Sequence, residues 1–160
     1  MLKPSHARGI VWALTLVLAI APLGATAAPA DDAKATVQRF VDGMNSGDFQ
    51  VLSLCAPSAT VIDDIPPYAW SGPGGCTRWF NDLVANMKNL GTTAVRATFD
   101  PPTTADVYNK TAYLVYPARF AVTSKGVQST KAGVITLVME QGADGWKFTH
   151  FIWGRTAQTP

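Results

Sequence analysis

Side chains that bind metals or act as nucleophiles are scarce in this chain. It has two histidines, His6 and His150, and two cysteines, and these form no cluster with Asp or Glu at metal-ligand spacing. No serine lies in a nucleophile-elbow motif, and no glycine-rich loop precedes the Lys-Ser/Thr pair of a phosphate site. The sequence therefore predicts no metal and no cofactor.

An excess of charge of one sign is also missing. The chain has 13 Lys and Arg against 11 Asp and Glu, but Lys3 and Arg8 precede the apolar segment described next, and without them the charges cancel. No Lys/Arg cluster remains in the rest of the chain. A nucleic acid or an anionic membrane needs such a cluster, so we expect neither as a partner.

The chain also lacks an apolar run long enough to span a membrane. Residues 9–21 are uncharged, whereas a spanning helix needs roughly 20 apolar residues. Basic residues before this run and Ala25-Thr26-Ala27 after it are typical of a signal peptide. We therefore expect a signal peptide over 1–27 with cleavage near Ala27 to Ala30, one domain over 31–156, and a tail over 157–160. The mature protein would be secreted or periplasmic, with no stable membrane anchor.

The two cysteines, Cys55 and Cys76, both follow the predicted signal peptide. In an oxidising compartment they can form a disulfide if their Cα atoms come within about 7 Å. A disulfide is the favoured interpretation. Two buried free thiols are the alternative, because free cysteine is among the most buried residue types.

Helices are predicted in the first half of the domain and strands in the second. Apolar residues spaced by three and four predict helices over 33–44, 49–54 and 76–90, the second capped by Asp48. Strands are predicted over 59–65, 94–99, 112–123, 134–140 and 146–154. This order indicates an α+β domain in which helices cover one face of a mostly antiparallel sheet.

Four segments fall in the order and spacing of ketosteroid isomerases and SnoaL-like polyketide cyclases: Val37-Gln38-Arg39-Phe40, Asn45-Ser46-Gly47-Asp48-Phe49, Ala59-Thr60-Val61-Ile62-Asp63 and Trp70-Ser71-Gly72. From Ala33 to Gly154 the chain resembles these members of the nuclear transport factor 2-like superfamily. The resemblance implies a curved sheet wrapped around three N-terminal helices, forming a cone with an apolar pocket. It also implies a homodimer formed through the sheet. The scaffold carries several reactions as well as non-catalytic proteins.

The resemblance also implies roles for single residues. In ketosteroid isomerase one Asp moves the proton, while a Tyr and a protonated Asp donate hydrogen bonds to the oxyanion. The base position is Asp63, followed by Asp64 where the isomerase has proline. The Tyr position is Phe40, which has no proton to donate, and the second donor falls near Thr136. Tyr68, Tyr113 or Tyr116 could replace the missing donor. The alternative for Asp63 is a solvated carboxylate at a strand end.

Aromatic side chains are the candidate walls of the pocket. The alternative for each of them is ordinary core packing. Strand alternation and the resemblance together predict that Lys147, Thr149, Phe151 and Trp153 face the pocket, with His150 on the opposite face unless a bulge intervenes. The expected pocket lining is Phe40, Trp70, Trp79, Phe120, Phe151 and Trp153.

Two functions of different class follow from these observations. The first is a cofactor-independent isomerase, cyclase or lyase that uses Asp63 as general base on an apolar or aromatic ring compound. The second is a non-catalytic module of the same fold that binds a small ligand or dimerises.

Overall fold

A computed structural model describes residues 28–159, and the predicted signal peptide over 1–27 lies outside them. The first helix, α1 (Pro29–Ser46), begins at a proline, which suits a helix start, and ends at Gly47, whose φ of 77° is left-handed. Its buried stripe includes Ala33, Val37, Phe40 and Val41. The predicted first helix is thus present.

The other two predicted helices differ in type. The segment η1 (Phe49–Leu54) is a 3₁₀-helix, and Asp48 caps it by accepting a hydrogen bond from the backbone N–H of Gln50 at 3.1 Å. The last helix, α2 (Gly75–Asn89), is a full α-helix whose buried residues are Gly75, Cys76 and Trp79. Among residues 28–159, neither α-helix is both long and apolar enough to cross a membrane.

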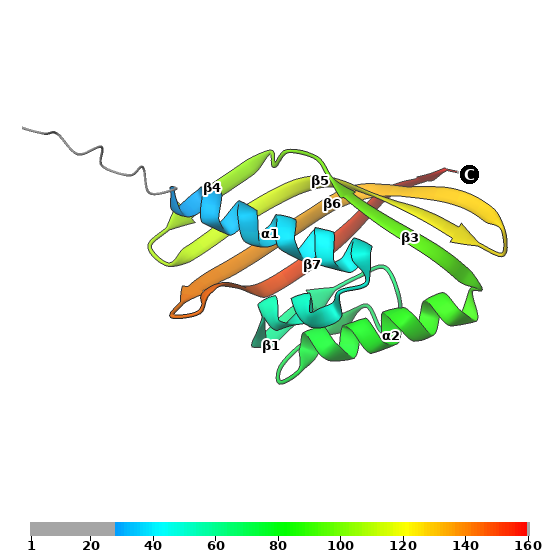
Figure 1. The fold of residues 1–160 in the computed structure, drawn as a ribbon, viewed down its shortest axis with the longest axis horizontal. Coiled ribbons are helices and arrows are strands. Elements are labelled where there is room, and N and C mark those ends of the chain that lie inside the picture. The colour runs from blue at the N-terminus through cyan, green and yellow to red at the C-terminus, as the bar shows by residue number, and fades with distance from the viewer. Residues whose placement is uncertain (1–27, 160) are drawn as a thin grey trace, which may run out of the picture.

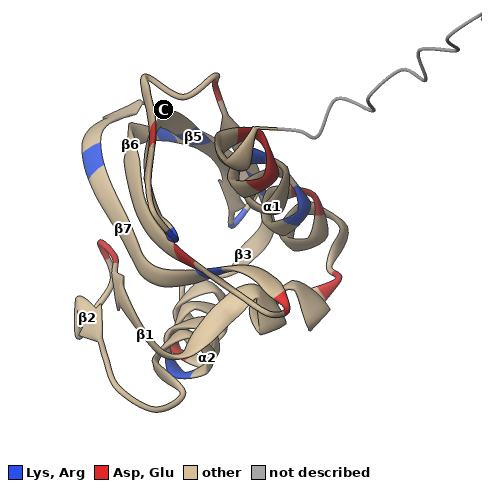
Figure 2. Ribbon diagram, turned by 90° about the vertical axis from the view of Figure 1, so that its left-hand side faces the viewer, with Lys and Arg blue, Asp and Glu red and all other residues tan. Residues whose placement is uncertain are grey.

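The strands form one seven-stranded mixed sheet in the order β2-β1-β7-β6-β5-β3, with β4 also paired to β5. Helices α1 and α2 lie on the same, concave side of this sheet (Figures 1 and 2). The ends of β5, β6 and β7 over residues 118–133 and 153–159, called the arms below, extend past α1 (Figure 1). The bounds are β1 (Cys55–Ile62), β2 (Ala69–Trp70), β3 (Thr92–Phe99), β4 (Thr104–Tyr108), β5 (Thr111–Ser124), β6 (Val127–Gly142) and β7 (Gly145–Thr159).

Pairing between strands accounts for most differences from the predicted elements. Pro101 and Pro102 interrupt what would be one strand opposite β5, so β3 pairs with residues 118–124 and the unpredicted β4 with residues 111–115. The strand β7 continues to Thr159, so residues 157–159, expected as a tail, belong to the sheet. The strand β1 begins at Cys55 and ends at Ile62, and it pairs with β7 in parallel. The remaining pairs are antiparallel, as predicted.

The core fills the space between the concave face and the two helices. Leu114, Ile135, Leu137 and Phe148 are at most 1% exposed and alternate with residues of the outer face. Lys, Arg, Asp and Glu positions are spread along the helices, turns and strands of the ribbon in Figure 2. The concave face therefore supplies the apolar surroundings in which a polar side chain is desolvated.

Candidate functional site

The candidate site is centred on Asp63, the first residue after β1. Its Oδ2 accepts a hydrogen bond from the indole Nε1–H of Trp79 at 2.7 Å, and its Oδ1 accepts one from the backbone N–H of Asp64 at 2.6 Å. Its own backbone N–H donates to the carbonyl oxygen of Tyr68 at 3.1 Å. Both carboxylate oxygens and the backbone are thus held by the protein, which orients the side chain.

The surroundings of Asp63 raise its pKa above the ordinary value of 3.8. Burial is the largest cause, because a desolvated carboxylate is harder to ionise. The hydrogen bonds from Trp79 and from the Asp64 backbone favour the ionised form and offset part of the increase, while the Asp64 side chain adds to it. The net result is a carboxylate with a stronger hold on a proton than an exposed Asp.

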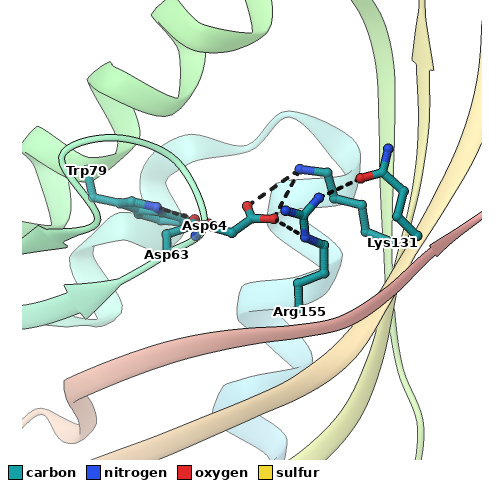
Figure 3. A network of polar contacts seen from close by, with 6 residues as sticks. Asp63, Asp64, Trp79, Lys131 and Arg155 are labelled. Carbon is teal, nitrogen blue, oxygen red and sulfur yellow. Dashed lines mark hydrogen bonds and ion pairs between the residues drawn. The ribbon is translucent and has the colours of Figure 1, made fainter.

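Asp64 points away from Asp63 and has different partners. Its Oδ2 lies 3.1 Å from Nε of Arg155 and 3.4 Å from Nζ of Lys131. Figure 3 shows the two carboxylates leaving the chain in different directions, Asp63 toward Trp79 and Asp64 toward the arms of β6 and β7. The neighbouring aspartates therefore serve two different clusters.

Helix α2 positions Trp79 for this contact. The Cys55–Cys76 disulfide joins the start of β1 to the first turn of α2, with the Cα atoms 6.4 Å apart, which confirms the predicted pairing. Gly75 lies against the backbone of Ala59, and a Cβ there would collide with the Ala59 carbonyl oxygen. Trp79 is three residues beyond Cys76, on the same helix face. Its ring packs against Phe151 with centroids 5.5 Å apart.

The hydroxyl groups expected as oxyanion donors lie in different places. Tyr68 is 59% exposed and Tyr113 is 45% exposed, on the outer face of β5. Thr136 alternates with the buried Ile135 and Leu137, so strand alternation places it on the outer face as well. Tyr113 and Thr136 therefore lie on the face opposite the core, and Tyr68 is largely exposed to solvent.

Tyr116 is the one expected donor on the concave face. It is 6% exposed, its ring lies 5.7 Å from that of Phe99, and burial raises its pKa to about 12. Within residues 28–159, no hydroxyl group donates to Asp63, whose side-chain donors are both nitrogen atoms. The indole of Trp79, expected only as a wall, is therefore the side-chain donor at this site.

Most of the expected wall residues pack in the core. Phe40 contacts Phe148 and Phe151 at ring-centroid distances of 5.1 and 5.8 Å. Trp70 is 4% exposed, and its indole N–H donates to Asp82 at 2.7 Å. Phe120 and Trp153 form a separate edge-to-face pair at 4.8 Å on the concave side of the arms.

A bulge in β7 changes the predicted alternation. The pairing with β6 shifts between Phe148 and His150, so Trp146 and Phe148 face inward before the bulge, and Phe151 and Trp153 after it. Lys147 therefore does not face the pocket; its Nζ donates to the carbonyl oxygen of Ser53 at 2.8 Å. His150 follows the extra residue and is exposed, on the face opposite Phe151 and Trp153; the bulge instead turns Trp146 and Phe148 inward.

One groove of the structure lies away from Asp63, beside α1. It has a volume of about 400 Å³, runs between α1 and strands β3 to β5, and is lined among others by Val37, Phe99 and Tyr116. Asp63 is not part of it. We place the candidate site at Asp63 because that residue combines a titratable group, burial and fixed geometry. The described residues hold no group of three His, Cys, Asp or Glu side chains arranged for a metal ion.

Sequence reasoning missed the two basic residues of the site. Lys131 and Arg155 lie 24 residues apart in sequence, in segments that were not predicted as strand. Their positions follow only from the register, in which Lys131 is opposite Phe120 and Arg155 is opposite Gly133. Longer predicted strands would have included Lys131 and Arg155. Strand alternation would then have placed both side chains on the inner face.

Comparison with known proteins shows similarity of fold to solved structures. No protein-family model and no curated protein matches it. Three solved structures, aligned over 82% of this chain, are similar in fold. A nuclear transport factor 2-like protein from Salmonella enterica serovar Typhimurium is 15% identical, with 94% of its chain covered and a TM-score of 0.66.

The second is a type 2 hexachlorocyclohexane dehydrochlorinase, 14% identical, with 90% covered and a TM-score of 0.66. The third is the CaMKII hub of S. rosetta, 17% identical, with 99% covered and a TM-score of 0.65. At such identities the similarity shows the fold alone. The curved sheet, the helices on its concave side and these neighbours together establish that the chain has the nuclear transport factor 2-like fold.

Proposed function

We propose that the protein is a cofactor-independent isomerase, cyclase or lyase in which Asp63 acts as general base. The observation that carries the proposal is a desolvated carboxylate, held by two N–H donors, whose pKa is raised by burial. A base is most effective when its pKa lies near the working pH, and burial moves Asp63 in that direction. The proton removed would lie on carbon next to a carbonyl group or an aromatic ring.

The hydrogen bonds to Asp63 suit a base that takes up and returns a proton. The Trp79 indole fixes the Oδ2 atom without itself being able to accept or lose a proton at ordinary pH. The oxyanion that forms on the substrate needs a separate donor. Tyr116 is the candidate for this role, because with a pKa of about 12 its hydroxyl stays protonated and lies on the concave face.

The experiment is deuterium exchange at carbon. A panel of cyclic and aryl ketones is incubated with the protein in D₂O, and exchange next to the carbonyl is followed by proton NMR. We expect the wild type to accelerate exchange for part of the panel and Asp63→Asn to abolish this acceleration. The matched control is Asp82→Asn, since Asp82 also accepts an indole hydrogen bond at 2.7 Å but lies outside the site.

Two results contradict the proposal. One is exchange by Asp63→Asn at the wild-type rate. The other is an equal loss of exchange in Asp63→Asn and Asp82→Asn, which would indicate a structural role for the carboxylate rather than proton transfer.

A second proposal concerns the outer face of the sheet and a non-catalytic, dimerising role. Ile62 on β1, Val134 on β6 and Tyr113 on β5 are 40%, 37% and 45% exposed on this face; β7 lies between β1 and β6. Exposed apolar side chains gathered on one face favour association with a second copy of the chain. We expect a homodimer in light scattering, and Val134→Lys should shift it to monomer. A wild-type monomer at working concentration would contradict this.

Export is also a proposal, based on the signal-peptide pattern of residues 1–27. A disulfide between Cys55 and Cys76 is consistent with an oxidising compartment. Expression of the full chain and sequencing of the mature N-terminus should locate cleavage between Ala27 and Ala30. Recovery of the intact N-terminus would contradict export by this signal.

A further inference from the structure

Two basic side chains share one carboxylate beside the candidate site. Lys131 on β6 and Arg155 on β7 both contact Oδ2 of Asp64, at 3.4 and 3.1 Å. The neighbouring carboxylate of Asp63 is directed to Trp79 instead. Among the described residues 28–159, this cation pair, Lys131 and Arg155, therefore has one acidic partner for two positive charges (Figure 3).

The cation pair has N–H groups that make no hydrogen bond to Asp64 or Gln158 and can donate to a ligand. The guanidinium of Arg155 has five N–H donors, of which Nε–H faces Asp64 and an Nη1–H donates to Gln158 at 2.5 Å. The side chains of Lys131 and Arg155 are 27% and 40% exposed, so a ligand can reach them. By contrast, Arg119 donates two hydrogen bonds of 2.7 Å to the two oxygens of Asp100, one cation to one carboxylate.

An aromatic wall lies next to the cation pair on the same face. The rings of Phe120 and Trp153 meet edge to face at 4.8 Å, and Phe120 is the cross-strand partner of Lys131. The Trp153 ring covers Gly133, where a Cβ atom would come within 2.7 Å of the ring. Arg155 lies opposite this glycine on β7. The inner face thus passes from aromatic to cationic within two residues along β7, from Trp153 to Arg155, and across the β5–β6 pair, from Phe120 to Lys131.

We propose that the compound on which Asp63 acts is a ring-containing acid, whose carboxylate binds Lys131 and Arg155 and whose ring packs against Trp153 and Phe120. This inference rests on the proposed function, because it places the ligand beside Asp63. Arg and Lys hydrogen-bond a carboxylate through charged donors, which are stronger than neutral ones. Asp64 holds the two cations in the free protein and shares them with the ligand carboxylate when it binds.

The test compares carboxylates with neutral analogues of the same shape. Titration calorimetry at pH 7 and low salt measures the affinity of benzoate, 2-naphthoate and cyclohexanecarboxylate, each paired with its primary amide. We expect at least one acid to bind about tenfold more tightly than its amide, the factor that a charge-assisted hydrogen bond typically contributes. This preference should weaken as salt screens the charges.

Substitutions in the cluster should move the affinity in opposite directions. Lys131→Met and Arg155→Met should each weaken acid binding about tenfold and leave amide binding unchanged. Asp64→Asn should strengthen acid binding, because it removes the competing carboxylate. Arg119→Met, which removes a cation of the distant pair with Asp100, is the control and should bind like the wild type. Thermal unfolding establishes that each variant is folded.

Three results overturn the inference. They are the absence of any acid that binds better than its amide, an unchanged acid affinity in both Lys131→Met and Arg155→Met, and a weaker acid affinity in Asp64→Asn. Asp63→Asn separates the two proposals, since it should keep the preference for acids while losing proton exchange. In the wild type, proton exchange without any preference for acids refutes the acid substrate alone. A preference for acids together with wild-type exchange in Asp63→Asn refutes the base alone.

Discussion

Trp79→Phe isolates the hydrogen bond that holds the proposed base. The substitution removes the indole N–H that donates to Asp63 at 2.7 Å and keeps an aromatic ring against Phe151. A hydrogen bond to an ionised group stabilises a protein by about 1.5–3 kcal/mol, and one between neutral groups by about 0.5–1.5 kcal/mol. The contribution of the Trp79 hydrogen bond that depends on the charge of Asp63 is the difference between these two ranges, about 1 kcal/mol.

The direction of the change in the Asp63 pKa depends on whether the hydrogen bond favours the ionised or the protonated carboxyl group. The indole N–H stabilises the carboxylate, so its loss raises the pKa of Asp63 further above 3.8. Between 3.8 and the folded-state pKa, the folded protein binds more protons than the unfolded chain, and stability falls as pH rises. Trp79→Phe raises the folded-state pKa of Asp63, so the pH range over which stability falls extends to higher pH. Its loss of stability relative to wild type should therefore grow as pH rises through the pKa of Asp63.

The assay is urea unfolding between pH 3 and pH 8, together with carbon-13 NMR of the Asp63 carboxyl group. Trp70→Phe is the matched control, because Trp70 is equally buried and donates to Asp82 at the same distance of 2.7 Å. It should leave the Asp63 titration unchanged. A loss of stability in Trp79→Phe that is constant over this pH range, with an unchanged Asp63 titration, would refute the reasoning.

Three further predictions concern stability. Asp63→Asn should be more stable than wild type at pH 7 in urea unfolding, and this gain should disappear below about pH 4, because the raised pKa makes ionised Asp63 destabilising. Reduction of Cys55–Cys76, which closes a loop with a sequence separation of 21, should lower the free energy of unfolding by about 3 kcal/mol; equal denaturation midpoints with and without reductant would contradict it. Gly133→Ala should destabilise the protein by about 1–3 kcal/mol by overpacking, first against the Gly154 carbonyl oxygen and then against the Trp153 ring, whereas Gly142→Ala, with open space around it, should be nearly neutral.

Local patterns were sufficient for much of the fold. The apolar stripe of α1 and the periodicity of α2 predicted both helices, because a helix that buries one face repeats its apolar residues every three to four positions. The pairing of Cys55 with Cys76 was also predictable, since the chain has no other cysteines. The lengths of the strands were not, because polar residues of the arms are stabilised by cross-strand pairing that no local pattern shows.

The sequence by itself determined the fold class, favoured the Cys55–Cys76 disulfide and singled out Asp63 as the candidate base, because each of these depends on local periodicity or on residue type. Only the tertiary structure decided the partners of that carboxylate. Trp79 reaches Asp63 from α2, and Lys131 and Arg155 reach Asp64 from two different strands. One extra residue in β7 decided which aromatic rings face inward. These contacts join residues 16 to 91 positions apart, and register and helix packing set them, not local propensity.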